Sequence, residues 1–229
     1  LNVGQPNNDT WARDHGFITL TAPGRPARLL DFRFNGWGDK FPADLDNAIN
    51  RRLYDEGKLE GIYEDHLDFV LEGGSIESDG RGTIFTTSGC LMAPHRNQPL
   101  SLKEIEDRLK TYLCAERIVW IDHGNLTGDD TDGPIDGHPY RLMRLPMPRP
   151  IHDEEGLRLP ATYANFLIIN GAVLCPTYAQ PDLDTEALRI VGEAFPDREI
   201  VGIDCRSIIR QHGSLHCCTM QFPEKVLKI

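Results

Sequence analysis

An internal repeat is the feature of this sequence that most restricts its fold. When the chain is shifted by 82 positions, residues 89–122 align with residues 171–204 without a gap. Nine aligned positions are identical: Gly89/Gly171, Pro94/Pro176, Gln98/Gln180, Pro99/Pro181, Glu104/Glu186, Ile118/Ile200, Val119/Val201, Ile121/Ile203 and Asp122/Asp204. One such unit cannot bury its own apolar face, so repeated units have to pack on one another. The repeat therefore predicts stacked or radial β/α units around a shared centre.

Each copy has the pattern of a short apolar strand, a proline-containing loop, an amphipathic helix and a buried strand. In the first copy, Ser101 and Glu104 form a capping-box pattern before a helix predicted at 102–113. The apolar stripe of that helix consists of Ile105, Leu109 and Leu113. The other predicted elements are a helix at 184–195 and strands at 117–122 and 199–204.

Composition excludes several classes of protein. With 40% hydrophobic and 26% charged residues, the chain of 229 residues has an ordinary globular composition. The formal net charge of −11 argues against nucleic acid as a partner and fits a cationic small ligand. No apolar run approaches the roughly 18 residues that cross a bilayer. We therefore expect no membrane and no nucleic-acid partner.

The six cysteines are spread along the chain, without the density of a disulfide scaffold. No C-x-x-C or H-E-x-x-H spacing is present, so we expect no structural zinc and reduced thiols in a cytoplasmic protein. The acidic stretch at 128–138 lacks the spacing of an EF-hand calcium loop.

Two segments carry more functional-looking side chains than packing needs. In residues 8–16 (NDTWARDHG), Trp11 and Asp14 stand close together, although a surface turn with an Arg–Asp salt bridge gives the same pattern. In residues 71–83, Glu72 ends an apolar run and is followed by two glycines. This places a carboxylate at a strand end beside flexible backbone, where it can face a cleft. A solvated hairpin shoulder is the alternative.

Residues 213–221 (GSLHCCTMQ) place two cysteines directly after a histidine. If this stretch is a strand, His216 and Cys217 point to opposite faces, and only one of Cys217 and Cys218 can face a cleft. A reactive thiol needs a base or a positive charge nearby, which has to come from elsewhere in the chain. Two inert core cysteines are the alternative.

Taken together, seven motifs resemble the family of agmatine deiminases and Porphyromonas-type peptidylarginine deiminases. The motifs are NDTWARDHG, FNGWG, LEGGSI, TTSGCLMAPHRNQPLS, GDDTDG, YANFLIINGAVLCPTY and HGSLHCCTMQFP, in family order over nearly the whole chain. The resemblance implies an α/β fold, a pseudo-symmetric five-unit β/α propeller around a central active site, which accounts for the repeat. It also implies one deiminase domain over residues 1–229.

The same resemblance implies roles for individual residues. Cys217 matches the family nucleophile, and Glu72 matches the acid that orients the catalytic imidazole. Cys218 stands where the family has an ordinary apolar residue, so we expect it to face the core. The positions that match substrate-binding residues are Trp11, Asp14, Asp136 and Asn165.

The proton-transfer motif departs from the family. The family pattern is G-D-x-T-x-G-H-[IV]-D, but residues 128–136 read GDDTDGPID, with Pro134 in place of the histidine and Asp136 matching the aspartate. Either the chain has lost its base, or His138 has replaced it, or residues are absent from the sequence near 133–138. We favour the third explanation, because residues 136–150 look like a family segment that normally lies roughly 40 residues further on. The start of the sequence at Leu1 points the same way, and the match of Asp136 would then be accidental.

The resemblance implies hydrolysis of a cationic guanidine, most simply agmatine to N-carbamoylputrescine and ammonia, with no cofactor and no metal. A peptidylarginine deiminase is the alternative within this class. If Pro134 truly replaces the histidine, a guanidine-binding protein with impaired catalysis is a further alternative. An amidinotransferase is disfavoured because nothing in the sequence indicates a second amine site. A homo-oligomer is left open.

Overall fold

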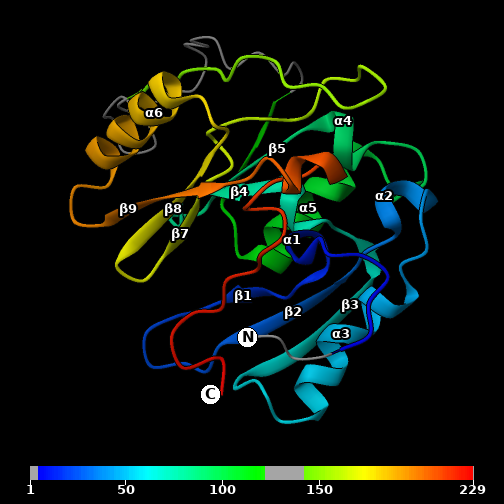
Figure 1. Ribbon diagram of the computed structural model, residues 1–229. Helices are drawn as coiled ribbons and strands as arrows, with labels where there is room; N and C mark the ends of the chain where they lie inside the picture. The colour runs from blue at the N-terminus through cyan, green and yellow to red at the C-terminus, as the bar shows by residue number, and fades with distance from the viewer. Residues whose placement is uncertain (1–4, 122–141, 229) are drawn as a thin grey trace. The chain divides into compact units, whose positions relative to one another are not determined.

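One structural unit occurs three times in the described part of the chain. The computed structural model describes residues 5–121 and 142–228 (Figure 1). Each unit is an antiparallel pair of strands, then a helix, then a third strand that pairs in parallel with the second strand. The result is three separate three-stranded sheets with the orders β1-β2-β3, β4-β5-β6 and β7-β8-β9. The chain therefore has the α/β fold that the repeat predicted.

The bounds of the elements follow the order of the units. The first unit consists of β1 (Ile18–Leu20), β2 (Arg28–Arg33), α3 (Asp44–Asp55) and β3 (Ile62–Val70). The second consists of β4 (Ile76–Ser78), β5 (Thr83–Thr86), α5 (Leu102–Leu113) and β6 (Arg117–Trp120). The third consists of β7 (Leu167–Ile169), β8 (Ala172–Thr177), α6 (Pro181–Ala194) and β9 (Glu199–Asp204). The short helices are α1 (Ala12–His15), α2 (Gly36–Asp39) and α4 (Ser88–Leu91), with 3₁₀ turns at Gly73–Ser75 and Ile208–Gln211.

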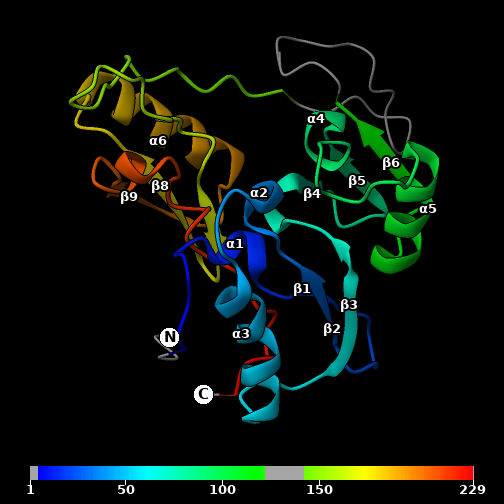
Figure 2. The same ribbon diagram turned by 90° about the vertical axis from the view of Figure 1, so that its right-hand side faces the viewer.

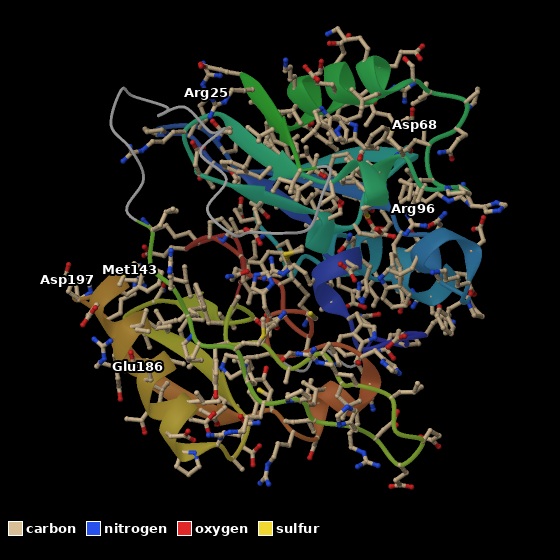
Figure 3. The ribbon with its side chains drawn as sticks, turned by 90° about the horizontal axis from the view of Figure 1, so that it is seen from above. Arg25, Asp68, Arg96, Met143, Glu186 and Asp197 are labelled. Carbon is tan, nitrogen blue, oxygen red and sulfur yellow. The ribbon has the colours of Figure 1, made fainter. Side chains whose placement is uncertain are left out.

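Each long helix covers the sheet of its own unit. Helix α3 packs on β2, α5 on β6, and α6 on β8 and β9 (Figure 2). The capping box predicted at Ser101 and Glu104 is present at the start of α5. Further along α5, Arg108 forms an ion pair of 3.2 Å with Asp68 of β3. Asp68 is labelled in Figure 3.

The predicted helices and the strands that follow them are confirmed, but the first strand of the first repeat copy is wrong. Residues 88–91 form helix α4, because the Thr87 hydroxyl accepts a hydrogen bond from the Cys90 backbone N–H at 3.3 Å and caps a helical turn. Leu91 fills the core from that helix. The strand that pairs with β6 is β5, which lies before the aligned window.

The chain divides into two compact units of packing, residues 1–124 with 220–229, and residues 125–219. In the first, one core cluster joins both sheets, with Leu30, Phe32, Phe69 and Leu71 against Ile84, Leu91, Ile105 and Leu109. The C-terminal segment belongs to this unit, since Val226 packs with Phe17 and Leu29. In the second, Tyr163, Tyr178, Ala187 and Ile209 form a core of their own.

No helix in the described residues combines the length and the apolar character that a membrane crossing requires.

Two leucines of α5 test the apolar stripe that the sequence predicted. Leu109 is fully buried, whereas Leu102 in the first turn is 39% exposed. We expect Leu109→Ala to lower the free energy of unfolding by about 2–5 kcal/mol, because it leaves a cavity in the core. Leu102→Ala is the matched control and should change it by about 0.5 kcal/mol or less. Urea unfolding measures both, and equal effects would contradict this placement of the helix.

Candidate functional site

Asp14 is held in a fixed orientation by two donors from different loops. The Trp37 indole Nε1 donates to Asp14 Oδ2 at 3.0 Å, and the Gly74 backbone N–H donates to Asp14 Oδ1 at 3.0 Å. Trp37 lies in the loop that follows the carboxyl end of β2, and Gly74 follows the carboxyl end of β3. Because β2 and β3 are parallel, both loops leave the sheet at the same edge.

The two glycines after Glu72 allow this close approach. A side chain on Gly73 would place its Cβ 2.2 Å from the Arg13 carbonyl oxygen of α1. A Cβ on Gly74 would lie 2.5 Å from Asp14 Oδ1. The Gly-Gly pair is therefore needed to seat the chain against α1, rather than for flexibility as such.

Burial raises the pKa of Asp14 above its ordinary value of 3.8, since a buried carboxylate loses hydration. The hydrogen bonds from Trp37 and Gly74 oppose this effect, and the nearby negative charge of Glu72 adds to it. A cation that reached Asp14 would restore the stability of its charged form. The site therefore favours a positively charged ligand.

Glu72 is 4% exposed and lies two residues after Val70, the end of β3, at the start of the 3₁₀ turn Gly73–Ser75. The alternative of a solvated hairpin shoulder is therefore wrong. Its Oε1 lies 2.9 Å from Arg96 Nη2, and the Cys90 thiol donates to its Oε2 at 3.2 Å. Burial and the charge of Glu72 raise the pKa of the Cys90 thiol to about 12, so Cys90 stays a hydrogen-bond donor.

Trp11 is 7% exposed and immediately precedes α1, the short helix that carries Asp14. His15, at the end of α1, is also buried, and neither ring nitrogen has a hydrogen-bond partner among the described residues. Burial lowers the pKa of His15, which favours the neutral imidazole. Within the segment 8–16, residues 12–15 thus form a short helix with Trp11 and His15 buried at its two ends, whereas Asn8 and Thr10 are exposed as in a surface turn.

In the second packing unit, Asn165 fixes the position of the Cys217 sulfur. The His216 backbone N–H donates to Asn165 Oδ1 at 2.8 Å, and Asn165 Nδ2 donates to Cys217 Sγ at 3.3 Å. The orientation of the amide follows from chemistry, because a backbone N–H requires an oxygen, which turns the amide nitrogen towards the sulfur.

A hydrogen-bond network holds the loops of Asn165 and Cys217. The Tyr178 hydroxyl donates to the Thr162 carbonyl at 2.9 Å and lies 3.3 Å from Ser214 Oγ, which is buried. Asp184 accepts from the Tyr163 hydroxyl at 2.6 Å and from the Tyr178 backbone N–H at 3.0 Å. The loops before Asn165 and before Cys217 are therefore tied to the same core tyrosine.

The segment around Cys217 is a turn and not a strand. The Cys217 N–H donates to the Ser214 carbonyl at 3.1 Å, and the Thr219 N–H donates to the His216 carbonyl at 3.1 Å. Strand alternation therefore does not separate the two thiols. Cys217 and Cys218 are both half-buried, so burial does not distinguish them, and the orientation of Cys218 towards the core stays a prediction.

The structure brings the predicted site residues together in two groups. Asp14 and Glu72 interact electrostatically in the first packing unit, and Trp11, three residues before Asp14, is buried. Asn165 and Cys217 are hydrogen-bonded in the second. Asp136, Pro134 and His138 lie outside the described residues.

Sequence reasoning assigned no role to three side chains that hold the acids: Trp37, Cys90 and Arg96. All three lie within the motifs FNGWG and TTSGCLMAPHRNQPLS. Membership of those motifs was the available signal. It could not tell which side chain meets which carboxylate.

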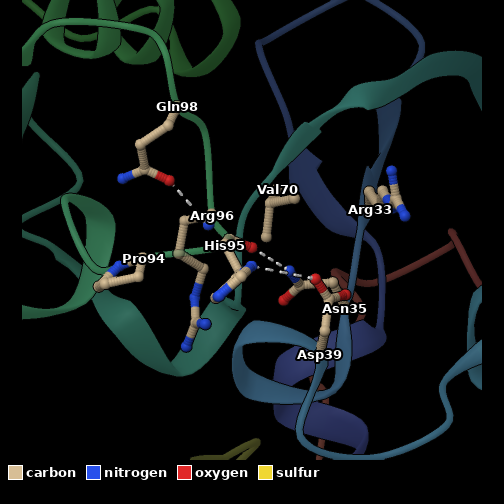
Figure 4. Close-up of a pocket in the computed structure, with 8 residues that line it drawn as sticks. All are labelled: Arg33, Asn35, Asp39, Val70, Pro94, His95, Arg96 and Gln98. Carbon is tan, nitrogen blue, oxygen red and sulfur yellow. Dashed lines mark hydrogen bonds and ion pairs between the residues drawn. The ribbon is translucent and has the colours of Figure 1, made fainter.

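A pocket of the first packing unit lies beside this group (Figure 4). It is lined by Arg33, Asn35, Asp39, Val70, Pro94, His95, Arg96 and Gln98. Asn35 joins its two walls, because its Nδ2 donates to the His95 carbonyl while its Oδ1 accepts from the Gly38 N–H at 3.0 Å. Among the described residues, no group of three or more His, Cys, Asp or Glu side chains is placed to hold a metal ion.

The contact between Asn165 and Cys217 generates a prediction about thiol reactivity. Asn165→Asp keeps the acceptor for the His216 N–H but replaces the donor at the sulfur by an anion. We expect the alkylation rate of Cys217 by iodoacetamide at pH 7 to fall by about tenfold or more, since the thiolate is the reacting form. Mass spectrometry of the alkylated peptides measures this rate, with Cys218 as the internal control. An unchanged rate at Cys217 would show that the amide does not act on the sulfur.

Comparison with known proteins places the chain in a family. The model of the Porphyromonas-type peptidyl-arginine deiminase family matches residues 2–138 and 134–223. A putative agmatine deiminase of Marinomonas sp. is 32% identical over 282 aligned positions, which cover 96% of this chain and 75% of the relative.

Two solved structures are similar throughout. A putative arginine deiminase from Porphyromonas gingivalis is 45% identical, with a TM-score of 0.90 over 98% of this chain and 78% of that one. A cysteine-to-serine variant of C. jejuni agmatine deiminase with substrate bound is 36% identical, with a TM-score of 0.80 over 93% of this chain and 73% of that one. The α/β fold is thus that of known guanidine-modifying enzymes, and the chain belongs to the Porphyromonas-type peptidyl-arginine deiminase family, as a hydrolase that acts on carbon–nitrogen bonds.

Proposed function

We propose that this protein hydrolyses the guanidinium group of agmatine, giving N-carbamoylputrescine and ammonia through a covalent intermediate on Cys217. The observation that carries the proposal is the Asn165 amide that holds the Cys217 sulfur in a fixed turn. Relatives with the name agmatine deiminase, at 30–33% identity over at least 95% of this chain, support the choice of substrate.

Binding of a planar cation suits the acidic side chains. Asp14, with each oxygen already oriented by one donor, still has acceptor capacity for the N–H groups of a guanidinium. In this proposal Asp136 is the second carboxylate of the clamp, and Trp11 lines the pocket for the substrate. Fixing the plane of the guanidinium also fixes the direction from which its central carbon is attacked.

The chemistry then takes two displacements. The Cys217 thiolate attacks the central carbon, a proton is delivered to one amino nitrogen, and the C–N bond breaks to release ammonia. The resulting S-alkylthiouronium is attacked by water, which loses a proton as the C–S bond breaks. This step regenerates the Cys217 thiolate and releases the ureido product. In this scheme Glu72 orients the imidazole that moves the protons. Proton transfer by such a group typically accelerates a reaction by about 10²–10⁴-fold.

The motif in this sequence does not supply the imidazole, because Pro134 stands at the position of the family histidine. We propose that an internal segment is missing from this sequence near residues 133–138. Two observations support this. The family model matches in two stretches that overlap at residues 134–138, and the alignment with the Marinomonas protein extends over 282 positions although the chain has 229 residues.

On this proposal the whole chain forms one deiminase domain with the five-unit propeller of the family. Three units of matching topology are present in the described residues, which supports the arrangement. The cytoplasmic location and the oligomeric state stay predictions.

A second candidate function follows from Pro134 taken literally, namely a protein that binds guanidines with impaired turnover. Agmatine binding measured by calorimetry, without release of ammonia, would favour it. A peptidylarginine deiminase is supported by the description of the matching family model. Comparison of free agmatine with an arginine-containing peptide as the substrate distinguishes these activities.

The two adjacent thiols test the assignment of the nucleophile. In the full-length protein, Cys217→Ala should abolish ammonia release from agmatine, because no sulfur is left at the position that Asn165 holds. Cys218→Ala is the matched control and should keep most of the activity. A coupled assay for ammonia measures both variants. The reverse pattern would overturn the assignment.

The pKa of Asp14 predicts how agmatine binding depends on pH. The cation favours the charged carboxylate, whereas burial favours the neutral acid, so binding should release a proton. Affinity should therefore fall as the pH decreases through the raised pKa of Asp14, at pH values above the ordinary 3.8.

Calorimetric titration of the Cys217→Ala variant at several pH values measures this dependence without turnover. Asp14→Asn in the same background should bind more weakly and lose this part of the pH dependence. If both proteins show the same dependence, Asp14 is not the titrating group.

A further inference from the structure

Glu72 and Arg96 form an ion pair that is almost completely withdrawn from solvent. Their side chains are 4% and 9% exposed, and Arg96 Nη2 lies 2.9 Å from Glu72 Oε1. A buried carboxylate stays ionised only where a cation or several donors compensate for the lost hydration. The second carboxylate oxygen accepts one hydrogen bond, from the uncharged Cys90 thiol.

Asp14 is a charged group near Glu72 and has the same negative sign. Among the described residues, Asp14 of α1 adds a negative charge, Cys90 of α4 is a neutral donor, and Arg96 from the loop before α5 supplies a positive charge. The two carboxylates repel each other, and the charge of Glu72 raises the pKa of Asp14. Arg96 offsets this repulsion on the side of Glu72.

The structure fixes Arg96 from three sides. Asn97, the next residue, forms hydrogen bonds of 2.9 Å with both the N–H and the carbonyl of Val70, at the end of the strand that leads to Glu72. The Arg96 backbone N–H donates to Gln98 Oε1 at 3.1 Å. Gly38 leaves room for the guanidinium, since a Cβ there would lie 2.2 Å from Arg96 Nη1.

These contacts place the Arg96 side chain between a pocket and the buried carboxylate of Glu72. One side lines the pocket shown in Figure 4, together with Arg33 and His95. On the other side, its Nη2 contacts the carboxylate of Glu72. In an exposed arginine, water would compete for the guanidinium and the side chain would change rotamer. The backbone of Arg96 is fixed by a hydrogen bond, and its side chain is only 9% exposed.

We propose that Arg96 is a positioning residue, which compensates the charge of the buried Glu72 carboxylate and holds it oriented for its part in deimination. The kinetic part of this inference rests on the proposed function. The coupling between Arg96 and Glu72 does not, and it can be measured in the folded protein without substrate.

The experiment compares Arg96→Met, Glu72→Gln and the double variant in the full-length protein. Arg33→Met is the matched control, because Arg33 lines the same pocket but is exposed and has no contact with Glu72 in the structure. Arg96→Lys tests whether a positive charge alone is sufficient, since lysine lacks the planar geometry of a guanidinium.

We expect Arg96→Met to lower kcat for agmatine by on the order of 10²-fold, with KM changed much less. The double variant should be no slower than Glu72→Gln alone, because Arg96 acts through Glu72. Arg96→Lys should recover part of kcat, and Arg33→Met should resemble the wild type. Multiplicative losses in the double variant, or an equal loss in Arg33→Met, would overturn the proposal.

The midpoint of thermal unfolding at neutral pH provides the second readout. Arg96→Met leaves a buried carboxylate without its cation, so this variant should unfold at a lower temperature than the wild type. The double variant should regain part of that loss, because the amide of Glu72→Gln carries no charge to compensate. A double variant whose midpoint equals the sum of two independent losses would overturn the proposal. If the wild type releases no ammonia from agmatine, the proposed function fails, and the unfolding midpoints alone decide whether Arg96 stabilises the buried Glu72 carboxylate.

Discussion

Two neighbouring acidic side chains, the half-buried Asp14 and the buried Glu72, are the constraint on which the first packing unit depends. Each oxygen of Asp14 faces one donor, and each oxygen of Glu72 faces one partner. These partners come from the loops after β2, β3 and β5, so three stretches of chain must meet at one place. The short helices α1, α2 and α4 lie in or beside these loops and are too short to be stabilised by helix propensity. They are held by the contacts that also hold the acids.

Much of the regular structure could be predicted because local and global signals agree there. Helix α5 has a capping box, a stripe of three buried apolar residues and a strand after it, and its bounds are those predicted. The first β/α unit was not predicted from the repeat, although it has the same topology as the other two. Its helix α3 buries the polar residues Asp46 and Asn50, which bond to the N-terminal segment and to Asp31, so its apolar pattern is weaker.

The site could be predicted only as far as single residues matched family motifs. The motifs predict Asp14, Glu72, Asn165 and Cys217, and the structure places them in two pairs. Asp14 and Glu72 interact electrostatically, and Asn165 is hydrogen-bonded to Cys217. Contacts through space, such as Arg96 on Glu72, are invisible to spacing along a single sequence. The turn at Cys217 could not be predicted, because a short stretch of this kind fits a strand equally well. The contact that distinguishes the turn from a strand comes from the Asn165 amide, 52 residues earlier in the chain.

The most direct test of the account is the mass of the Cys217 peptide during turnover. Full-length protein is mixed with agmatine, quenched in acid within the first turnover, digested and analysed by mass spectrometry. The account predicts that Cys217 carries the mass of agmatine less that of ammonia, and that the adduct disappears when the substrate is exhausted. Ammonia release with Cys217 unmodified at every time point, or an adduct on Cys218 instead, would contradict it.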